Sequence, residues 1–250
     1  GINLNSHYTE FKRIDRLTEF NYGSGSDFIS TLFENDLNSV GNGFSFQIGA
    51  IYKLEYFRVG LSYQSPVWYN LTDELVQYLE TSKINGIDIV DPRVINIYEY
   101  NLKTPSILSV GLARVFGSKG LITLQYDFTD FTNLKFNVGD GDRNFINQNN
   151  TIERSLKSAG TIKLGGEYRV SRLSFRAGYH NQQSINKKIK DENQGFSFGL
   201  GYDLGGSLLN IGVLNQKIER AELMYQEGLN QNINLKNAQT QFCIGLTIKL

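Results

Sequence analysis

Residues 43–66 read GFSFQIGAIYKLEYFRVGLSYQSP and predict two long strands joined by a short turn at Leu54-Glu55. Successive side chains of a strand point to opposite faces, so alternation of bulky apolar with small or polar residues indicates two different solvents. The apolar face collects Phe44, Phe46, Ile48, Ala50, Tyr52, Val59, Leu61 and Tyr63, and the other face collects Ser45, Gln47, Gly49, Lys53, Arg58, Gly60, Ser62 and Gln64. Each strand has about ten residues, close to the length that a tilted strand needs to cross a bilayer.

Composition narrows the classes of function. The chain has 250 residues with 25 basic and 25 acidic side chains, so no basic excess favours a nucleic-acid partner. Cys243 is the single cysteine, which excludes an internal disulfide and a cysteine-based zinc site. The sequence contains no P-loop, no paired histidines and no calcium loop of the usual spacing, so we expect no cofactor and no metal. It also lacks an apolar run of the length that a transmembrane helix requires.

The same alternation recurs along the chain and predicts ten strands in all. These strands cover residues 2–13, 43–53, 58–64, 108–113, 122–129, 162–169, 173–180, 196–202, 209–213 and 242–250. Their connections alternate between long and short, and the long ones cover about 14–41, 67–104, 133–157, 184–194 and 217–237. Short turns at one end and long loops at the other are typical of outer-membrane barrels.

The predicted fold is therefore an all-β, transmembrane, antiparallel up-and-down β-barrel. The alternative is a soluble β-sandwich, which gives no reason for every long loop to lie at one end and usually has shorter strands. Inside the long connections two helices are expected. One covers residues 27–33, with Ser26 or Asp27 as its cap, and the other covers 72–81, where Leu71, Leu75, Tyr78 and Leu79 follow helical spacing.

Four stretches resemble the FadL/TodX-type outer-membrane transporters of hydrophobic compounds. They are residues 43–71, 102–116, 122–136 and 162–184, and the hairpin LGGEYRVSRLSFRAGY at 164–179 is among the most specific. The resemblance implies a fourteen-stranded barrel with an N-terminal hatch in its lumen. The ten strands would be strands five to fourteen, so residues 1–250 would form one barrel domain whose hatch and first strands lie upstream of Gly1.

The resemblance also implies a function and a location, the outer membrane of a Gram-negative bacterium. Family members take up long-chain fatty acids and other small hydrophobic molecules passively, after capture in a groove between two extracellular loops, which by position are 14–41 and 67–104. Apolar residues of these loops that would line the groove are Phe28, Leu32, Phe33, Trp68, Leu75, Tyr78 and Leu79. The alternative is that these side chains only pack the two loops together as a lid.

The polar face of the strands carries charges that a barrel would direct into its lumen. They are Arg58, Asp127, Lys163, Glu167, Arg169, Arg176 and His180. A lumenal cation could hold the carboxylate of a ligand, and Arg58 and Arg176 are the candidates. The alternative is a charge-balanced ladder that fills the barrel interior.

Two rival functions remain. An outer-membrane enzyme would need a cluster around His180, but no Ser/His/Asp arrangement follows from the spacing, so no enzyme is predicted. A structural or partner-binding barrel would keep the fold without transport. The expected partners are outer-membrane lipid and a hydrophobic ligand or detergent, with other outer-membrane proteins or the chain's own N-terminal segment as further candidates.

Overall fold

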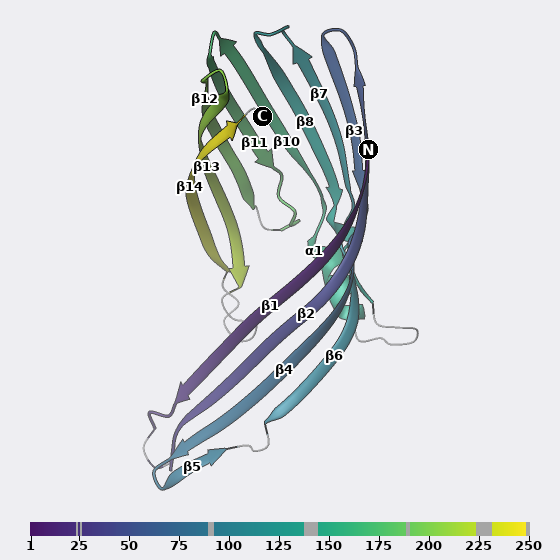
Figure 1. Cartoon of the computed structure of the whole chain (residues 1–250). Helices are drawn as coiled ribbons and strands as arrows, with labels where there is room; N and C mark the ends of the chain where they lie inside the picture. Colours follow the sequence, from purple (N-terminus) through teal and green to yellow (C-terminus); the bar gives the residue numbers. More distant parts are fainter. Residues whose placement is uncertain are drawn as a thin grey trace.

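The protein is one antiparallel β-sheet that curves like the wall of a barrel (Figure 1). The computed structural model describes residues 1–23, 25, 27–89, 93–137, 145–188, 191–223 and 232–248. The strands follow one another in the order β14-β13-β12-β11-β10-β8-β7-β3-β2-β4-β6-β9, while β1 pairs with β2 and β5 pairs with β4. Their bounds are β1 (Ile2–Phe20), β2 (Phe28–Lys53), β3 (Phe57–Gln64), β4 (Trp68–Lys83), β5 (Gly86–Ile89), β6 (Val94–Lys103), β7 (Ile107–Val115), β8 (Gly120–Asp130), β9 (Lys135–Asn137), β10 (Ser158–Val170), β11 (Leu173–Gln182), β12 (Glu192–Asp203), β13 (Ser207–Leu223) and β14 (Asn232–Ile248).

All ten predicted strands are present, and short turns join them in pairs at one end of the sheet. These turns connect β2 to β3, β7 to β8, β10 to β11 and β12 to β13. Gly117 and Gly205 have φ angles of 57° and 94°, and Ser171 has a φ of 53°. Such left-handed conformations allow the chain to reverse within a few residues.

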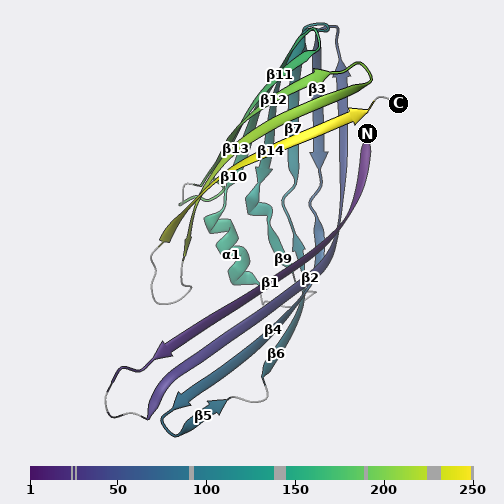
Figure 2. The same ribbon diagram turned by 60° about the vertical axis from the view of Figure 1, so that its left-hand side comes forward.

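The prediction of two helices is wrong, because both segments are strands. Residues 27–33 begin β2, and residues 72–81 lie within β4, which pairs with β2 along one edge and with β6 along the other. The helical spacing of apolar residues is real, but hydrogen bonding to two neighbouring strands outweighs it. Among the described residues the helices are α1 (Ile146–Ser155), which Figure 2 labels, and a single 3₁₀ turn, η1 (Phe131–Asn133); both follow β8 in the chain.

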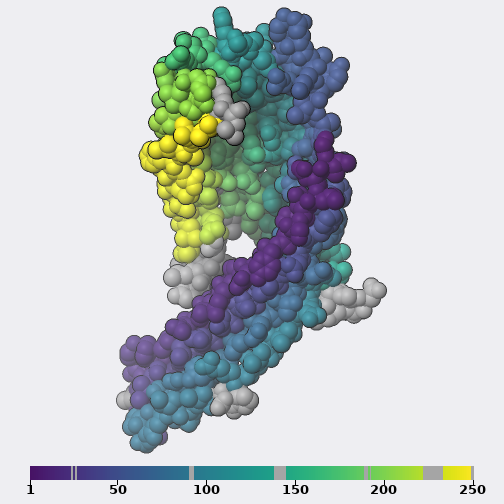
Figure 3. Space-filling model, viewed as in Figure 1, coloured from purple at the N-terminus to yellow at the C-terminus, as the bar shows by residue number. Residues whose placement is uncertain are grey.

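The expected long loops at 14–41 and 67–104 are also mostly strand. They lengthen the sheet beyond the wall into an extension made of residues 8–20 of β1, 28–42 of β2, 69–83 of β4, all of β5 and 94–102 of β6. Figure 3 shows the extension projecting away from the wall. The chain therefore offers a structured surface on that side of the molecule rather than loose loops.

The sheet has two chemically different faces, as its sequence predicts. We call the face that carries Gln47, Ser62 and Lys163 the inner face, and the face that carries Leu61, Leu124 and Phe175 the outer face. Side chains directly opposite each other on paired strands share a face, so the register assigns every described residue. Leu61, Leu124, Phe175 and Ile244 are 55%, 44%, 46% and 75% exposed. The outer face thus has no protein packed on it.

Little of the molecule is a packed core. Among described residues the buried apolar side chains are Val67, Leu71 and Ala159, and the fully buried polar ones are Ser45 and Ser65. Most of these lie where the extension meets the wall. The free edges of β1 and β14 do not pair with each other in the described part of the chain.

Candidate functional site

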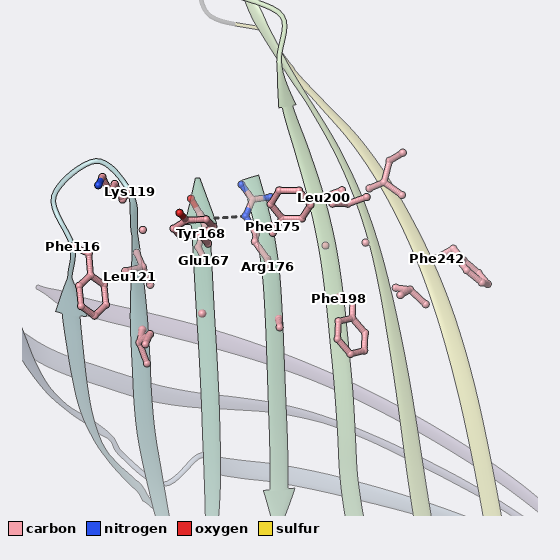
Figure 4. A pocket seen from close by; sticks show the side chains of 18 residues that line it. Phe116, Lys119, Leu121, Glu167, Tyr168, Phe175, Arg176, Phe198, Leu200 and Phe242 are labelled. Atoms are coloured by element: carbon pink, nitrogen blue, oxygen red, sulfur yellow. Dashed lines mark hydrogen bonds and ion pairs between the residues drawn. The ribbon is translucent and has the colours of Figure 1, made fainter. Parts of the chain in front are cut away.

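The inner face of the wall carries an ion-pair network centred on Glu167. Arg176 lies directly opposite Glu167, and its Nε is 2.9 Å from Glu167 Oε2 (Figure 4). Arg169 also pairs with Glu167, and Nη1 of Arg176 donates to Oδ1 of Asn210 over 2.7 Å. Arg176 is therefore engaged by a carboxylate and an amide, as a charge-balanced ladder requires.

A second ion pair lies on the inner face nearer the extension. Lys163 Nζ is 2.7 Å from Asp127 Oδ2, and the side-chain amide of Gln125 donates to the same carboxylate over 2.7 Å. Arg58 differs from these residues, because it forms no ion pair within the described ranges and lies opposite another cation, Lys53. Arg58 is thus the inner-face arginine available to an anionic ligand.

The predicted groove residues divide between the two faces of the extension. Leu79 lies opposite Phe33 and Leu75 opposite Leu37, all on the inner face. Phe28 lies opposite Lys83 at the tip. Leu32, Tyr78 and Trp68 lie on the outer face, opposite Glu80, Glu34 and Phe44. Because β2 and β4 pair as neighbours, the two segments do not enclose a groove between them, which corrects the sequence-based expectation.

The inner face of the extension nevertheless carries several apolar rows, which alternate with polar rows such as Asn35–Gln77 and Ser39–Asp73. Leu17, Phe33 and Leu79 form one cross-strand row. Leu37 and Leu75 form another apolar row, two residues farther along each strand toward the wall than the row of Asn35 and Gln77. Leu71 continues these rows toward the wall and is only 7% exposed. We call these apolar rows together the apolar strip, which extends from the tip of the extension to the mouth of the barrel with one polar row between each apolar row and the next.

An aromatic cluster ends this strip at the mouth. The ring centroids of Tyr100, Phe136 and Phe145 lie 5.2–5.7 Å apart, within the range of attractive aromatic contacts. Tyr100 comes from β6, Phe136 from β9 and Phe145 from the start of α1. Sequence reasoning missed all three, because they are separated in sequence and only the pairing of β9 with β6 brings them together.

Polar groups fix the position of Tyr100. Its hydroxyl donates to both oxygens of Asp73 over 3.2 and 3.1 Å, and Ser39 Oγ donates to the same carboxylate over 2.5 Å. Burial raises the pKa of Tyr100 above its ordinary value, and the negative charge of Asp73 raises it further. The ring therefore stays neutral and presents its apolar face to the cluster.

A depression of about 900 Å³ lies in the wall beside the short turns. Gly166 lies opposite Ala177, and their small side chains leave space that is bordered by Ile122, Phe175 and Phe198 (Figure 4). These residues belong to the outer face, so the depression belongs to the apolar surface. It offers room for an acyl chain, and the charged residues at its border are Lys119 in a short turn and the ion-paired Glu167 and Arg176.

The described residues show no sign of metal chemistry or of a membrane-spanning helix. They contain no group of three His, Cys, Asp or Glu side chains placed to hold a metal ion. No helix among them is long and apolar enough to cross a membrane. His180 lies opposite Lys163 on the inner face, and Cys243 is exposed with a free thiol.

The comparison with known families decides the identity of the chain. Residues 9–211 match the family described as outer membrane protein transport protein (OMPP1/FadL/TodX). This chain is a member of the FadL/TodX family. It is therefore an outer-membrane transport protein of a Gram-negative bacterium and not an enzyme.

Several solved structures have a fold similar to that of this chain. The CymD monoaromatic hydrocarbon channel is 13% identical, with a TM-score of 0.52 over 100% of this chain and 68% of that one. A Pseudomonas aeruginosa FadL homologue is 12% identical, with a TM-score of 0.54 over 98% and 68%. The P. putida toluene transporter TodX is 15% identical, with a TM-score of 0.50 over 90% and 55%. No curated protein sequence matches the chain.

The chain thus spans 55–68% of the length of these solved relatives. The similarity confirms the predicted all-β barrel fold, and the curved sheet of this protein is the wall of such a barrel. By the usual asymmetry of outer-membrane barrels, we propose that the short turns face the periplasm and that the extension is extracellular.

Proposed function

We propose that this protein takes up small hydrophobic molecules passively, with long-chain fatty acids as one substrate class. Family membership supports transport, and two solved relatives are described as a monoaromatic hydrocarbon channel and a toluene transporter. The apolar strip and the aromatic cluster on the inner face supply a surface that such molecules can follow from outside the membrane to the lumen.

The aromatic cluster carries this proposal. It stands on the inner face where the extension meets the wall, on β6, β9 and the start of α1, whose positions Figure 2 shows. Rings of this kind bind apolar ligands through large contact areas at low conformational cost. Capture on a single curved face replaces the groove between two loops that the sequence suggested.

Arg58 is the proposed contact for a carboxylate in the lumen. It lies on the inner face without an anionic partner in the described residues, whereas Arg176 is engaged by Glu167 and Asn210. A fatty acid would present its carboxylate to Arg58 through a charge-assisted hydrogen bond. A hydrocarbon without a head group would not depend on this residue.

Uptake by cells that produce the protein tests the proposal. Radiolabelled oleate and radiolabelled toluene are supplied to cells with the intact protein, with Phe136→Ala/Phe145→Ala, or with no transporter. The double variant should reduce uptake of both compounds about thirtyfold or more, since each lost aromatic contact weakens binding by roughly 1–3 kcal/mol. Phe198→Ala, on the lipid-facing side, is the matched control and should leave uptake unchanged.

If cells with the intact protein take up oleate and toluene no faster than cells without transporter, the proposal is wrong. If the protein then co-purifies in a stable complex without bound lipid, the structural or partner-binding alternative takes its place. Equal uptake by the double variant and the intact protein would remove the aromatic cluster from the route.

A further inference from the structure

Two rows of side chains cross the outer face where the extension leaves the wall. The first row joins aromatic and basic residues on β2, β4, β6 and β9, which are Phe44, Trp68, Lys103 and Lys135. The second row lies one step farther from the wall and consists of Asn42, Asn70, Asn101 and Asn137. We call these eight residues the collar. All eight are exposed, so the collar is free to bind.

The first row marks the level of the membrane surface. Trp68 is stacked on Phe46 with ring centroids 6.4 Å apart, and Phe46 also contacts Tyr63. Aromatic rings collect at the boundary between hydrocarbon and head groups, where one end of the ring is apolar and the other is wet. The collar therefore faces the head groups of the outer leaflet rather than hydrocarbon or bulk water.

The two lysines lie next to each other without an acidic partner. Lys103 lies directly opposite Lys135, and neither forms an ion pair within the described part of the chain. The nearest carboxylate along this strand and face belongs to Glu99, four residues from Lys103, which is roughly 13 Å along an extended strand. Two like charges side by side are unfavourable unless an anion sits between them.

A hollow of about 740 Å³ accompanies the asparagine row. Most of its lining comes from two outer-face rows, Asn42–Asn70–Asn101 and Val40–Thr72–Glu99. Each asparagine offers two amide donors and a carbonyl acceptor, which match the mixed donors and acceptors of sugar hydroxyls. The hollow thus has room and chemistry for a sugar ring directly beside the two lysines.

We infer that the collar binds a phosphorylated glycolipid of the outer leaflet. Lys103 and Lys135 hold a phosphate on the glycolipid's sugar, the asparagine row and its hollow receive the sugar, and Phe44 and Trp68 contact the start of the acyl chains. The site is continuous with the lipid-facing wall and lies outside the uptake route on the inner face. It is a lipid contact that positions the extension on the membrane surface.

Binding to a purified glycolipid tests the site. The protein is extracted from outer membranes in mild detergent, and its affinity is measured for lipid A with both phosphates and for the same lipid A after removal of the phosphates. The intact protein should bind the phosphorylated form at least about tenfold more tightly, because two charge-assisted contacts depend on the phosphate. Lys103→Gln/Lys135→Gln should abolish this difference, while Lys103→Arg/Lys135→Arg should keep it.

Two control variants distinguish specific binding at the collar from nonspecific electrostatic attraction to the lipid. Lys53→Gln/Lys119→Gln removes the same charge from the periplasmic end of the wall and should leave the affinity unchanged. Asn70→Ala/Asn101→Ala should weaken binding of both forms of lipid A and should not affect binding to phosphatidylglycerol, which has phosphate but no sugar. The oleate uptake of each variant is first compared with that of the intact protein, so that a folding defect is recognised.

Three results would overturn the inference. The first is that the intact protein binds lipid A equally tightly with and without its phosphates. The second is that the lysine variants of the collar and of the periplasmic end lose the same amount of affinity for lipid A. The third is that the protein binds phosphatidylglycerol as tightly as lipid A. The last result would assign the lysines to phospholipid head groups in general.

Discussion

His7 of β1 and Ser45 of β2 hold the wall and the extension together at their junction. Nε2 of His7 lies 2.8 Å from Oγ of Ser45, and the Ser45 side chain is completely buried. At the same point β2 changes neighbours, since residues 28–44 pair with β4 and residues 47–53 pair with β3. Between these two pairings, Ser65 bonds to the β2 backbone, because its Oγ accepts a hydrogen bond from the N–H of Phe46 over 2.9 Å.

Substitution of Ser45 should destabilise this junction. Ser45→Ala loses the contact with His7 and should lower the free energy of unfolding by about 1 kcal/mol. Ser45→Leu adds volume at a site with no free space and should cost roughly 1–3 kcal/mol. Urea unfolding, followed by gel mobility of the folded and unfolded forms, measures both effects. Ser118→Ala in an exposed turn is the control, and a loss there as large as that of Ser45→Leu would contradict the explanation.

Gly41 should be intolerant of a side chain. A Cβ at this position would lie 2.6 Å from the backbone oxygen of Asn70, closer than non-bonded contact permits, and would also collide with Leu71. Gly41→Ala should therefore lower the free energy of unfolding by roughly 1–3 kcal/mol. Gly245, whose added Cβ would meet nothing within 4 Å, is the matched position. Gly245→Ala should change stability by less than about 0.5 kcal/mol.

The two lumenal arginines should differ in their effect on uptake. Arg58→Gln should slow uptake of oleate about tenfold or less and leave toluene uptake unchanged, because only oleate carries a carboxylate. Arg176→Gln should affect neither compound, since Arg176 is occupied by Glu167 and Asn210. Parallel uptake measurements on both variants check this prediction. Equal sensitivity of oleate and toluene to Arg58→Gln would show that Arg58 acts on the barrel rather than on the head group.

Tyr100 should ionise at a higher pH than the exposed tyrosines. Burial and the nearby Asp73 raise its pKa, so the folded state holds the phenol proton more tightly than the unfolded state does. The resulting stabilisation is complete below the ordinary tyrosine pKa of about 10 and is lost as the pH rises through the folded-state pKa. Ultraviolet titration of tyrosinate, compared between the intact protein and Tyr100→Phe, isolates this group. Tyr22, which is 93% exposed, provides the reference through Tyr22→Phe.

The sequence by itself determined the partition of the wall into an apolar and a polar face. Period-two alternation is a local property of a strand, so Leu124, Phe175 and Ile244 could be placed outward and Glu167 with Arg176 inward before any neighbour was known. The register then gave the partners, including the pairing of Glu167 with Arg176. Glu167 and Arg176 lie on two strands joined by one short turn, so the local sequence pattern was enough to place both side chains on the same face.

Only the tertiary structure decided the extension and the aromatic cluster. Residues 72–81 follow helical spacing, but pairing with β2 and β6 on both edges satisfies their backbone groups and makes them a strand. Tyr100, Phe136 and Phe145 meet because β9 pairs with β6 and α1 begins beside it, contacts that no local pattern encodes. Long-range strand pairing chooses the neighbours, and the neighbours determine which side chains can form a site.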